Sequence, residues 1–87
     1  MPLIEKEITI MNVQGLHARP AAIFMQIANK YDSKITVRKD NETVNGKSIM
    51  GILMLGAQYN SKITISADGK DALEAITELE EFLKKNE

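Results

Sequence analysis

An imidazole, a guanidinium group and a set of unpaired backbone amides come together in one short segment of this chain. The segment reads Gly15-Leu16-His17-Ala18-Arg19-Pro20-Ala21-Ala22 and contains the only histidine. It follows a strand-like alternation and precedes an apolar helical pattern, so His17 stands where a helix would begin. The first amides of a helix lack carbonyl partners, and the helix dipole favours negative charge there. The segment therefore predicts phosphate chemistry on His17.

A phosphohistidine site needs a neutral imidazole as nucleophile, access for a partner and positive groups around the phosphoryl group. As the N-cap of a helix, His17 would be exposed and adjacent to the amides of Ala18 and Arg19, which would bind the phosphoryl oxygens. The Arg19 guanidinium could add a two-pronged contact to the same group. The alternative is that His17 is a surface helix cap and Arg19 a solvated charge, which is the commoner role of a lone histidine before a helix.

Composition excludes several other classes of site. A chain of 87 residues is expected to form one domain, residues 1–87. It has no cysteine and one histidine, so we expect neither thiol chemistry nor a metal, and no cofactor is implied. The basic and acidic side chains number 11 and 12, which argues against nucleic acid as a partner.

The location of the protein can also be anticipated from its composition. Apolar runs fall short of the roughly 20 residues that a membrane helix needs, and no apolar leader stands at the N-terminus. We therefore expect a soluble, cytoplasmic protein without membrane insertion, and a monomer.

Residue patterning predicts four strands and three helices. Alternating apolar and polar residues favour strands at 4–11, 34–38, 42–45 and 62–66. Spacing of three to four residues favours helices over 18–31, 48–55 and from 71 onward. The order is βαββαβα. Strands with one apolar face need cover on one side only, which predicts a two-layer sandwich of helices on a sheet.

The ends and faces of the helices can be assigned more closely. Ser48 is a good N-cap for the second helix and Gly56 can terminate it. Asp71 and Glu74 have the spacing of a capping box for the third helix. Its buried stripe is expected to contain Leu73, Ile76, Leu79 or Leu83, and Phe82. Its outer face is expected to carry the ion pairs Glu80–Lys84 and Glu81–Lys85.

The Gly15–Ala22 segment resembles the active-site signature of the HPr family, the histidine-containing phosphocarriers of the bacterial phosphoenolpyruvate:sugar phosphotransferase system. A second segment, residues 45–56, resembles the regulatory serine site and second helix of that family. The interval between the two segments also matches. The resemblance implies an α+β fold: an open-faced β-sandwich of four antiparallel strands, with three helices on one face.

The resemblance also implies a role for each matching residue. His17 would be phosphorylated on Nδ1 by Enzyme I and would pass the phosphoryl group to a IIA protein or domain. Arg19 would assist transfer, and the amides of Ala18 and Arg19 would bind phosphate. Such a protein is an intermediate carrier in phosphoryl transfer rather than a stand-alone enzyme.

The second helix carries two further expectations. It is apolar nearly all round, so Ile52 and Leu55 are assigned to the core. The surplus apolar residues match the docking patch of the family: Ile49, Met50 and Leu53. Ser48 would be the serine that HPr kinase/phosphorylase modifies in the members so regulated, although a plain N-cap explains it equally well.

Two other functions stay open. The chain could be a regulatory binding module whose Ser48-phosphorylated form is a co-effector of a transcription regulator, or a phosphocarrier of the nitrogen branch. The chain departs from many relatives at residues 57–61, where a glycine is usual in the turn. Asn60 can adopt the left-handed conformation that such a turn requires. The departure bears on partner specificity rather than on fold.

Overall fold

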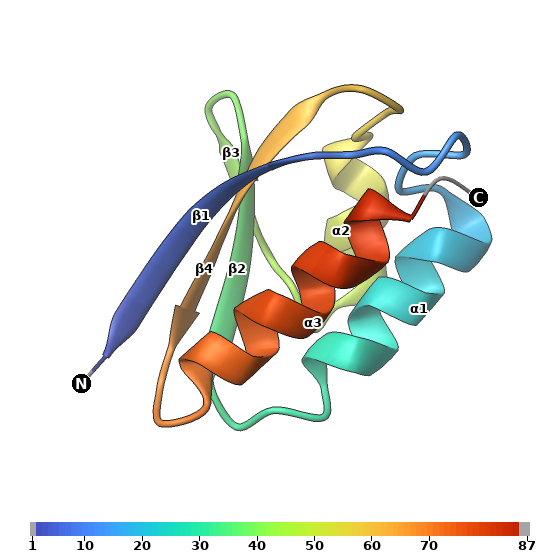
Figure 1. Ribbon diagram of the computed structural model, residues 1–87. Coiled ribbons are helices and arrows are strands. Elements are labelled where there is room, and N and C mark those ends of the chain that lie inside the picture. Colours follow the sequence, from blue (N-terminus) through green and yellow to red (C-terminus); the bar gives the residue numbers. More distant parts are fainter. Residues whose placement is uncertain (1, 86–87) are drawn as a thin grey trace.

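Residues 2–85, which the computed structural model describes, form one four-stranded antiparallel sheet and three helices in the order βαββαβα (Figure 1). The elements are β1 (Leu3–Thr9), α1 (Ala18–Ala28), β2 (Lys34–Lys39), β3 (Glu42–Asn45), α2 (Ile49–Leu55), β4 (Lys62–Asp68) and α3 (Ala72–Lys84). The strand order in the sheet is β1-β4-β2-β3. The expected fold is therefore confirmed. Among the described residues, no helix has the length and apolar character needed to cross a membrane.

One face of the sheet is apolar because the strand register aligns its inward-facing residues. Ile8 lies opposite Ile63, and Val37 lies opposite Ile65, and all four are buried. Lys6 also faces Ile65 across the register, in the middle of this apolar row. Its ammonium group leaves the row and reaches Glu80 of α3 at 2.7 Å. A charge in this position is accommodated because β1 is an edge strand.

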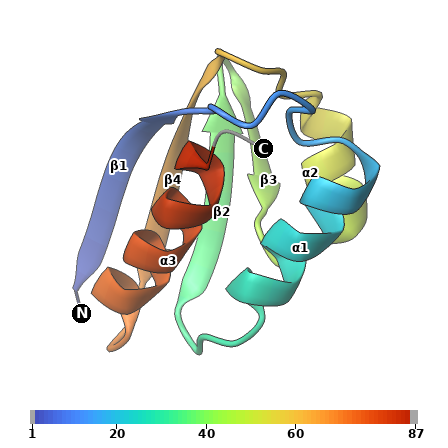
Figure 2. The same cartoon turned by 45° about the vertical axis from the view of Figure 1, so that its right-hand side comes forward.

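The three helices cover this apolar face as one layer (Figure 2). α3 packs against β1 and β4, α2 packs against β2 and β3, and α1 lies between α2 and α3. The buried face of α1 centres on Phe24, which has no exposed surface. Its small neighbours Ala21 and Ala28 are also fully buried and allow close helix packing.

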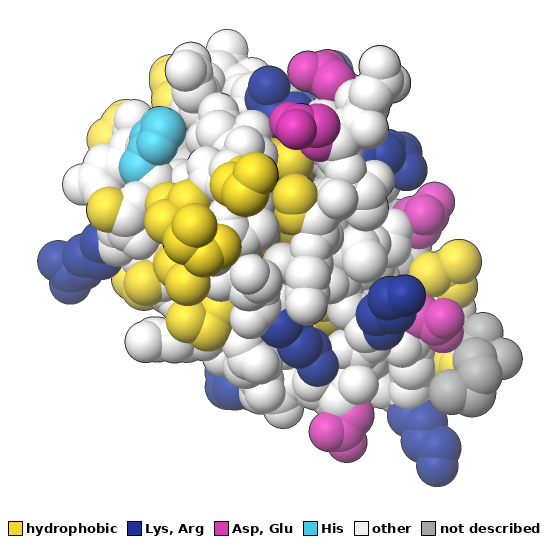
Figure 3. Space-filling view, turned by 180° about the vertical axis from the view of Figure 1, so that it is seen from behind, with side chains coloured by type: hydrophobic (Ala, Val, Ile, Leu, Met, Phe, Trp, Pro, Cys, Tyr) yellow, Lys and Arg dark blue, Asp and Glu magenta, His cyan; other side chains and the backbone are white. Residues whose placement is uncertain are grey.

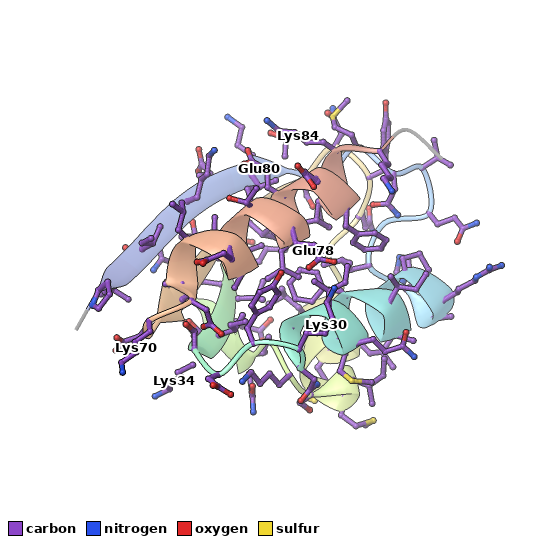
Figure 4. The ribbon with its side chains drawn as sticks, turned by 60° about the horizontal axis from the view of Figure 1, so that its bottom comes forward. Lys30, Lys34, Lys70, Glu78, Glu80 and Lys84 are labelled. Atoms are coloured by element: carbon purple, nitrogen blue, oxygen red, sulfur yellow. The ribbon has the colours of Figure 1, made fainter. Side chains whose placement is uncertain are left out.

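Polar contacts tie the end of α1 to α3. Lys30 and Glu78 point toward each other across the two helices and form an ion pair at 2.6 Å (Figure 4). The Tyr31 hydroxyl donates a hydrogen bond to the same carboxylate. This bond raises the pKa of Tyr31 to about 12, and the Lys30 and Tyr31 contacts lower the pKa of Glu78. The two helices therefore share a charged network outside the core.

Several expected helix features differ in the structure. α1 ends at Ala28, not at residue 31, because the Asn29 side chain donates to the carbonyls of Met25 and Lys47 and turns the chain. Leu73 is 63% exposed, because the buried stripe of α3 runs through Ala72, Ala75, Ile76, Leu79 and Leu83. Phe82 is half-buried against that stripe.

The prediction of a capping box at the start of α3 is also wrong. Asp71 is the N-cap but makes no side-chain capping bond. Its carboxylate instead accepts hydrogen bonds from the amides of Asp32 and Ser33, at 2.8 and 3.0 Å, and from the Ser33 hydroxyl. A tertiary contact has replaced the local one. On the last turn, Glu80 and Lys84 pair at 3.0 Å as expected, whereas Glu81 and Lys85 do not, because Lys85 lies beyond the helix.

The loop between β1 and α1 is packed tightly on the loop before β4. The Leu16 amide donates to the Ala57 carbonyl at 2.8 Å, and the Leu16 side chain is fully buried. Gly15 has a φ of +66°, and a Cβ atom there would lie 2.8 Å from the Ala57 oxygen. Earlier in the same loop, the Met11 amide donates a hydrogen bond to the Leu83 carbonyl at 2.8 Å. The chain is thus anchored on both sides of the turn that leads to His17.

Replacing Asp71 with asparagine is expected to lower the urea midpoint of unfolding at neutral pH. The Ser33 side chain and the Asp32 amide stabilise the carboxylate and lower the pKa of Asp71 below its ordinary value of 3.8. A lowered pKa in the folded state adds stability above that ordinary value, and this stability is lost as the pH falls through the lowered one. The difference in urea midpoint between Asp71→Asn and the parent protein should therefore become smaller at acid pH. Asp68→Asn, exposed at the end of β4, is the control and should change little.

Replacing Gly15 with alanine is expected to destabilise the protein more than replacing Gly56. Both glycines have similar positive φ values, +66° and +63°, but a Cβ at Gly56 would meet nothing within 4 Å. Each substitution should lose about 1–2 kcal/mol from the left-handed backbone. Gly15→Ala should lose about 1–3 kcal/mol more from overpacking against residues 57–59. Equal losses of unfolding free energy in the two variants would show that residues 57–59 accommodate the added Cβ atom without an energetic cost.

Candidate functional site

His17 occupies the N-cap of α1 with its side chain free. Its backbone is extended, with φ −107° and ψ 163°, and its carbonyl accepts the first helical hydrogen bond, from the Ala21 amide at 3.1 Å. The imidazole is exposed and makes no capping hydrogen bond. The expected placement of His17 at a helix start is therefore confirmed. A side chain in this position can be approached by another protein while its backbone stays fixed.

Two amides of the first turn of α1 are left to bind an anion. Pro20 has no N–H, and the Ala21 N–H is already bonded to the His17 carbonyl. Within residues 2–85, the first-turn donors left without a partner are the amides of Ala18 and Arg19, the pair that the sequence indicates. Ala18 has a φ of +23°, which L-residues rarely adopt. The backbone strain in this turn is therefore located directly beside His17.

The Arg19 side chain is exposed and lines a shallow cavity between the start of α1 and the end of α3. The cavity measures about 390 Å³, and its wall includes Phe82 and a second cation, Lys85. Arg19 therefore stands two residues after His17 with its side chain exposed. The segment around the histidine combines the amides of the first turn with an exposed guanidinium, a set of groups suited to phosphate.

Exposed apolar side chains of α2 form a patch on the surface that carries the histidine (Figure 3). Met50 is 63% exposed, Leu53 38% and Met54 72%. We call these three residues the α2 patch. Ile49 is half-buried against the core, so it contributes less to this surface than expected. Ile52 and Leu55 are buried, as their assignment to the core required.

Ser48 begins α2 as expected. Its Oγ accepts a hydrogen bond from the Gly51 amide at 3.1 Å, and the helix ends at Gly56 in the left-handed conformation. The hydroxyl is half-buried and occupied by this cap. The ammonium group of the preceding residue, Lys47, donates a hydrogen bond to the Tyr31 carbonyl at 2.6 Å.

Three residues around the candidate site were not predicted from the sequence: Asn12, Met54 and Tyr59. Asn12 is buried and donates from its side chain to the Gly15 carbonyl. Met54 and Tyr59 are exposed, Tyr59 by 49%. An asparagine three residues before a glycine is a turn signal that could have drawn attention to Asn12. Nothing in the apolar pattern of α2 distinguishes Met54 from its buried neighbours. Asn60 has a φ of 72°, so the turn before β4 is kept, as expected.

Residues 4–85 match the PTS-HPr family, described as the PTS HPr component phosphorylation site. The chain is 42% identical to the HPr-like protein Crh of Halalkalibacterium halodurans over 83 residues, which cover 95% of this chain and 99% of that protein.

Solved structures give the same result for the fold. The crystal structure of the phosphocarrier protein HPr from Bacillus anthracis has a TM-score of 0.91 and 43% identity, and the match covers 93% of this chain and 96% of that one. Crh from Bacillus subtilis, described as a catabolite repression protein that forms an intertwined, domain-swapped dimer, has a TM-score of 0.75 and 36% identity, with 93% of each chain covered.

The match over residues 4–85 coincides with the segment that holds both the exposed histidine and the capped serine. The relatives share its length as well as its fold. The chain belongs to the HPr family.

Proposed function

We propose that this protein is a phosphocarrier that receives a phosphoryl group on His17 and passes it to another protein. The observation that carries the proposal is the exposed imidazole at the start of α1, free of any capping bond and followed by the unpaired amides of Ala18 and Arg19. Within the HPr family, this arrangement supports the sugar phosphotransferase system as the setting. The donor is then Enzyme I and the acceptor a IIA protein or domain.

The transfer exchanges one P–N bond for another. The unprotonated Nδ1 of a neutral His17 forms a bond to phosphorus as the bond to the donor imidazole of Enzyme I breaks. The His17 ring gives up its remaining N–H proton, and the departing imidazole takes up one proton, so charge and atoms balance. The amides of Ala18 and Arg19 stabilise the phosphoryl oxygens without having to move far, because the helix already directs them outward. Arg19 turns its guanidinium from the cavity wall toward the same oxygens.

Partner docking is assigned to the α2 patch together with the rim of the histidine loop. Methionine side chains adapt to differently shaped surfaces, which suits a carrier that must bind a donor and several acceptors in turn. Met50 and Leu53 were expected at this surface, and Met54 joins them. The acting form is proposed to be the monomer, in which this surface and His17 are both open.

Incubation with Enzyme I and phosphoenolpyruvate is expected to add one acid-labile phosphoryl group to the protein, detected by intact mass. His17→Ala should accept none, because the nucleophile is absent. Arg19→Glu should be folded but slower by roughly tenfold or more, because a negative charge replaces a cation beside the phosphoryl group.

An unlabelled parent protein, or a labelled His17→Ala variant, would refute the carrier function. Lys62→Glu reverses an exposed charge in β4, outside the histidine segment and the α2 patch, and serves as the matched control for Arg19→Glu. It is expected to leave the transfer rate unchanged. If both variants slow transfer equally, the effect of Arg19 is one of overall charge rather than of contact with the phosphoryl group.

A second candidate function is regulation through Ser48, and the similarity to Crh proteins supports it. Ser48 lies at the N-cap of α2 and next to the α2 patch, so a phosphate there would add about two negative charges at the docking surface. This charge would repel acidic partners and attract basic ones, among them a transcription regulator. HPr kinase/phosphorylase is the proposed modifying enzyme. The nitrogen-branch alternative keeps the His17 chemistry and changes only the partners.

Treatment with HPr kinase/phosphorylase and ATP is expected to add one acid-stable phosphoryl group at Ser48, located by peptide mass spectrometry. The modified protein should then accept phosphate at His17 more slowly, because the new charge lies at the docking surface. Ser48→Ala should block the modification while losing about 1 kcal/mol of stability from the missing cap. If kinase treatment leaves Ser48 unmodified, Ser48 is a helix cap and the regulatory function is excluded.

A further inference from the structure

Asn12 is a buried polar residue in the loop that leads to His17. Its side chain is 6% exposed, and its Nδ2 group donates to the Gly15 carbonyl at 2.9 Å. The Gly15 amide donates in return to the Asn12 carbonyl at 3.0 Å. Together the two bonds close residues 12–15 into a tight loop. The loop ends two residues before the histidine.

Burial of the Asn12 side chain is unfavourable in free energy, which indicates that its amide has a specific structural role. Its Oδ1 atom is buried and has no hydrogen-bond partner among the described residues. An unsatisfied buried acceptor is unfavourable, and an apolar side chain of similar size would avoid it. Loop closure alone does not require the amide, because the backbone bond between Gly15 and Asn12 already closes the turn. The distinctive contribution of Asn12 is therefore the Nδ2 donor that fixes the direction of the Gly15 carbonyl.

The Gly15 carbonyl belongs to the peptide unit that joins Gly15 to Leu16. The N–H of that same unit donates to the Ala57 carbonyl at 2.8 Å. Both ends of one peptide unit are thus held, its oxygen by Asn12 and its nitrogen-bound hydrogen by the loop before β4. With this plane fixed and the Leu16 side chain buried, the direction in which the chain enters His17 is determined.

We propose that Asn12 is a positioning residue for phosphoryl transfer: through the Gly15 carbonyl, it sets the orientation of His17 relative to the free amides of Ala18 and Arg19. It touches neither the imidazole nor the phosphoryl group. The inference rests on the proposed carrier function. It deepens that function by naming the buried group that holds the phosphate-binding turn in its reactive geometry. Small errors in the placement of reacting groups reduce rates strongly, so loss of this bond should affect chemistry more than folding.

The test compares Asn12→Asp and Asn12→Ala with the parent protein. Asn12→Asp keeps the size of the side chain but replaces the Nδ2 donor with an acceptor, and Asn12→Ala removes the group altogether. His17 is phosphorylated in two ways, by Enzyme I with phosphoenolpyruvate and by phosphoramidate, a small chemical donor that requires no docking. The measurements are kcat/KM for the enzymatic reaction and the first-order rate of phosphohistidine hydrolysis.

In folded protein, both variants are expected to lower kcat/KM by about tenfold and to change the hydrolysis rate severalfold, since the amides no longer meet the phosphoryl oxygens correctly. Asn29→Ala is the matched control, because Asn29 also donates from its side chain to backbone carbonyls, but at the far end of α1. It should lose stability and keep both rates. Rates within twofold of the parent in both Asn12 variants, or equal changes in Asn29→Ala, would overturn the proposal.

A measurement on the unmodified chain covers the case in which the variants do not fold. The Nδ2 protons of Asn12 should exchange with solvent much more slowly than those of the exposed Asn41, before and after phosphorylation by phosphoramidate. Exchange as fast as that of Asn41 would overturn the proposal. If Enzyme I fails to phosphorylate the parent while phosphoramidate succeeds, the carrier function fails, and the hydrolysis rates still decide the role of Asn12.

Discussion

The packing of the histidine loop on the backbone of residues 57–59 is the constraint on which the candidate site depends. Gly15 fits there only because it lacks a Cβ atom, and Leu16 is buried with its amide bonded to Ala57. These contacts hold the backbone just before His17. The imidazole is therefore exposed while the backbone that carries it keeps a fixed orientation. An exposed imidazole on a fixed backbone is what the proposed transfer between two proteins requires.

The rest of the fold supplies the two surfaces that this loop joins. On the inside, the apolar sheet face and the buried side of α1 keep the start of the helix in place. On the outside, α2 presents Met50, Leu53 and Met54. The same short helix thus contributes to the core through Ile52 and Leu55, and to the exposed apolar surface through its opposite side. Ser48 caps this helix, so the phosphate proposed there would lie next to the α2 patch and outside the apolar core.

Much of the fold could be predicted because the spacing of apolar residues indicates which face of each helix or strand is buried. The order of elements, the helix start at His17 and the cap at Ser48 all follow from local signals and are confirmed. The errors occur where long-range contacts compete with local ones. Asp71 bonds to Asp32 and Ser33 instead of closing a capping box. Leu73 is exposed because two alanines, which give a weak hydrophobic signal, pack α3 against its neighbours.

The sequence by itself determined which groups stand at the candidate site: one imidazole, an arginine two residues later, and the start of a helix with its first amides. These are local properties, set by residue type and by the backbone of a single turn. Only the tertiary structure decided how that turn is held and which residues surround it. Asn12 acquires a role because folding buries its amide against the Gly15 carbonyl, and Met54 becomes part of a surface because no other element covers it. The hydrogen bond of Asn12 is local, but its burial and the exposure of Met54 depend on how elements far apart in the chain pack together, which no local pattern encodes.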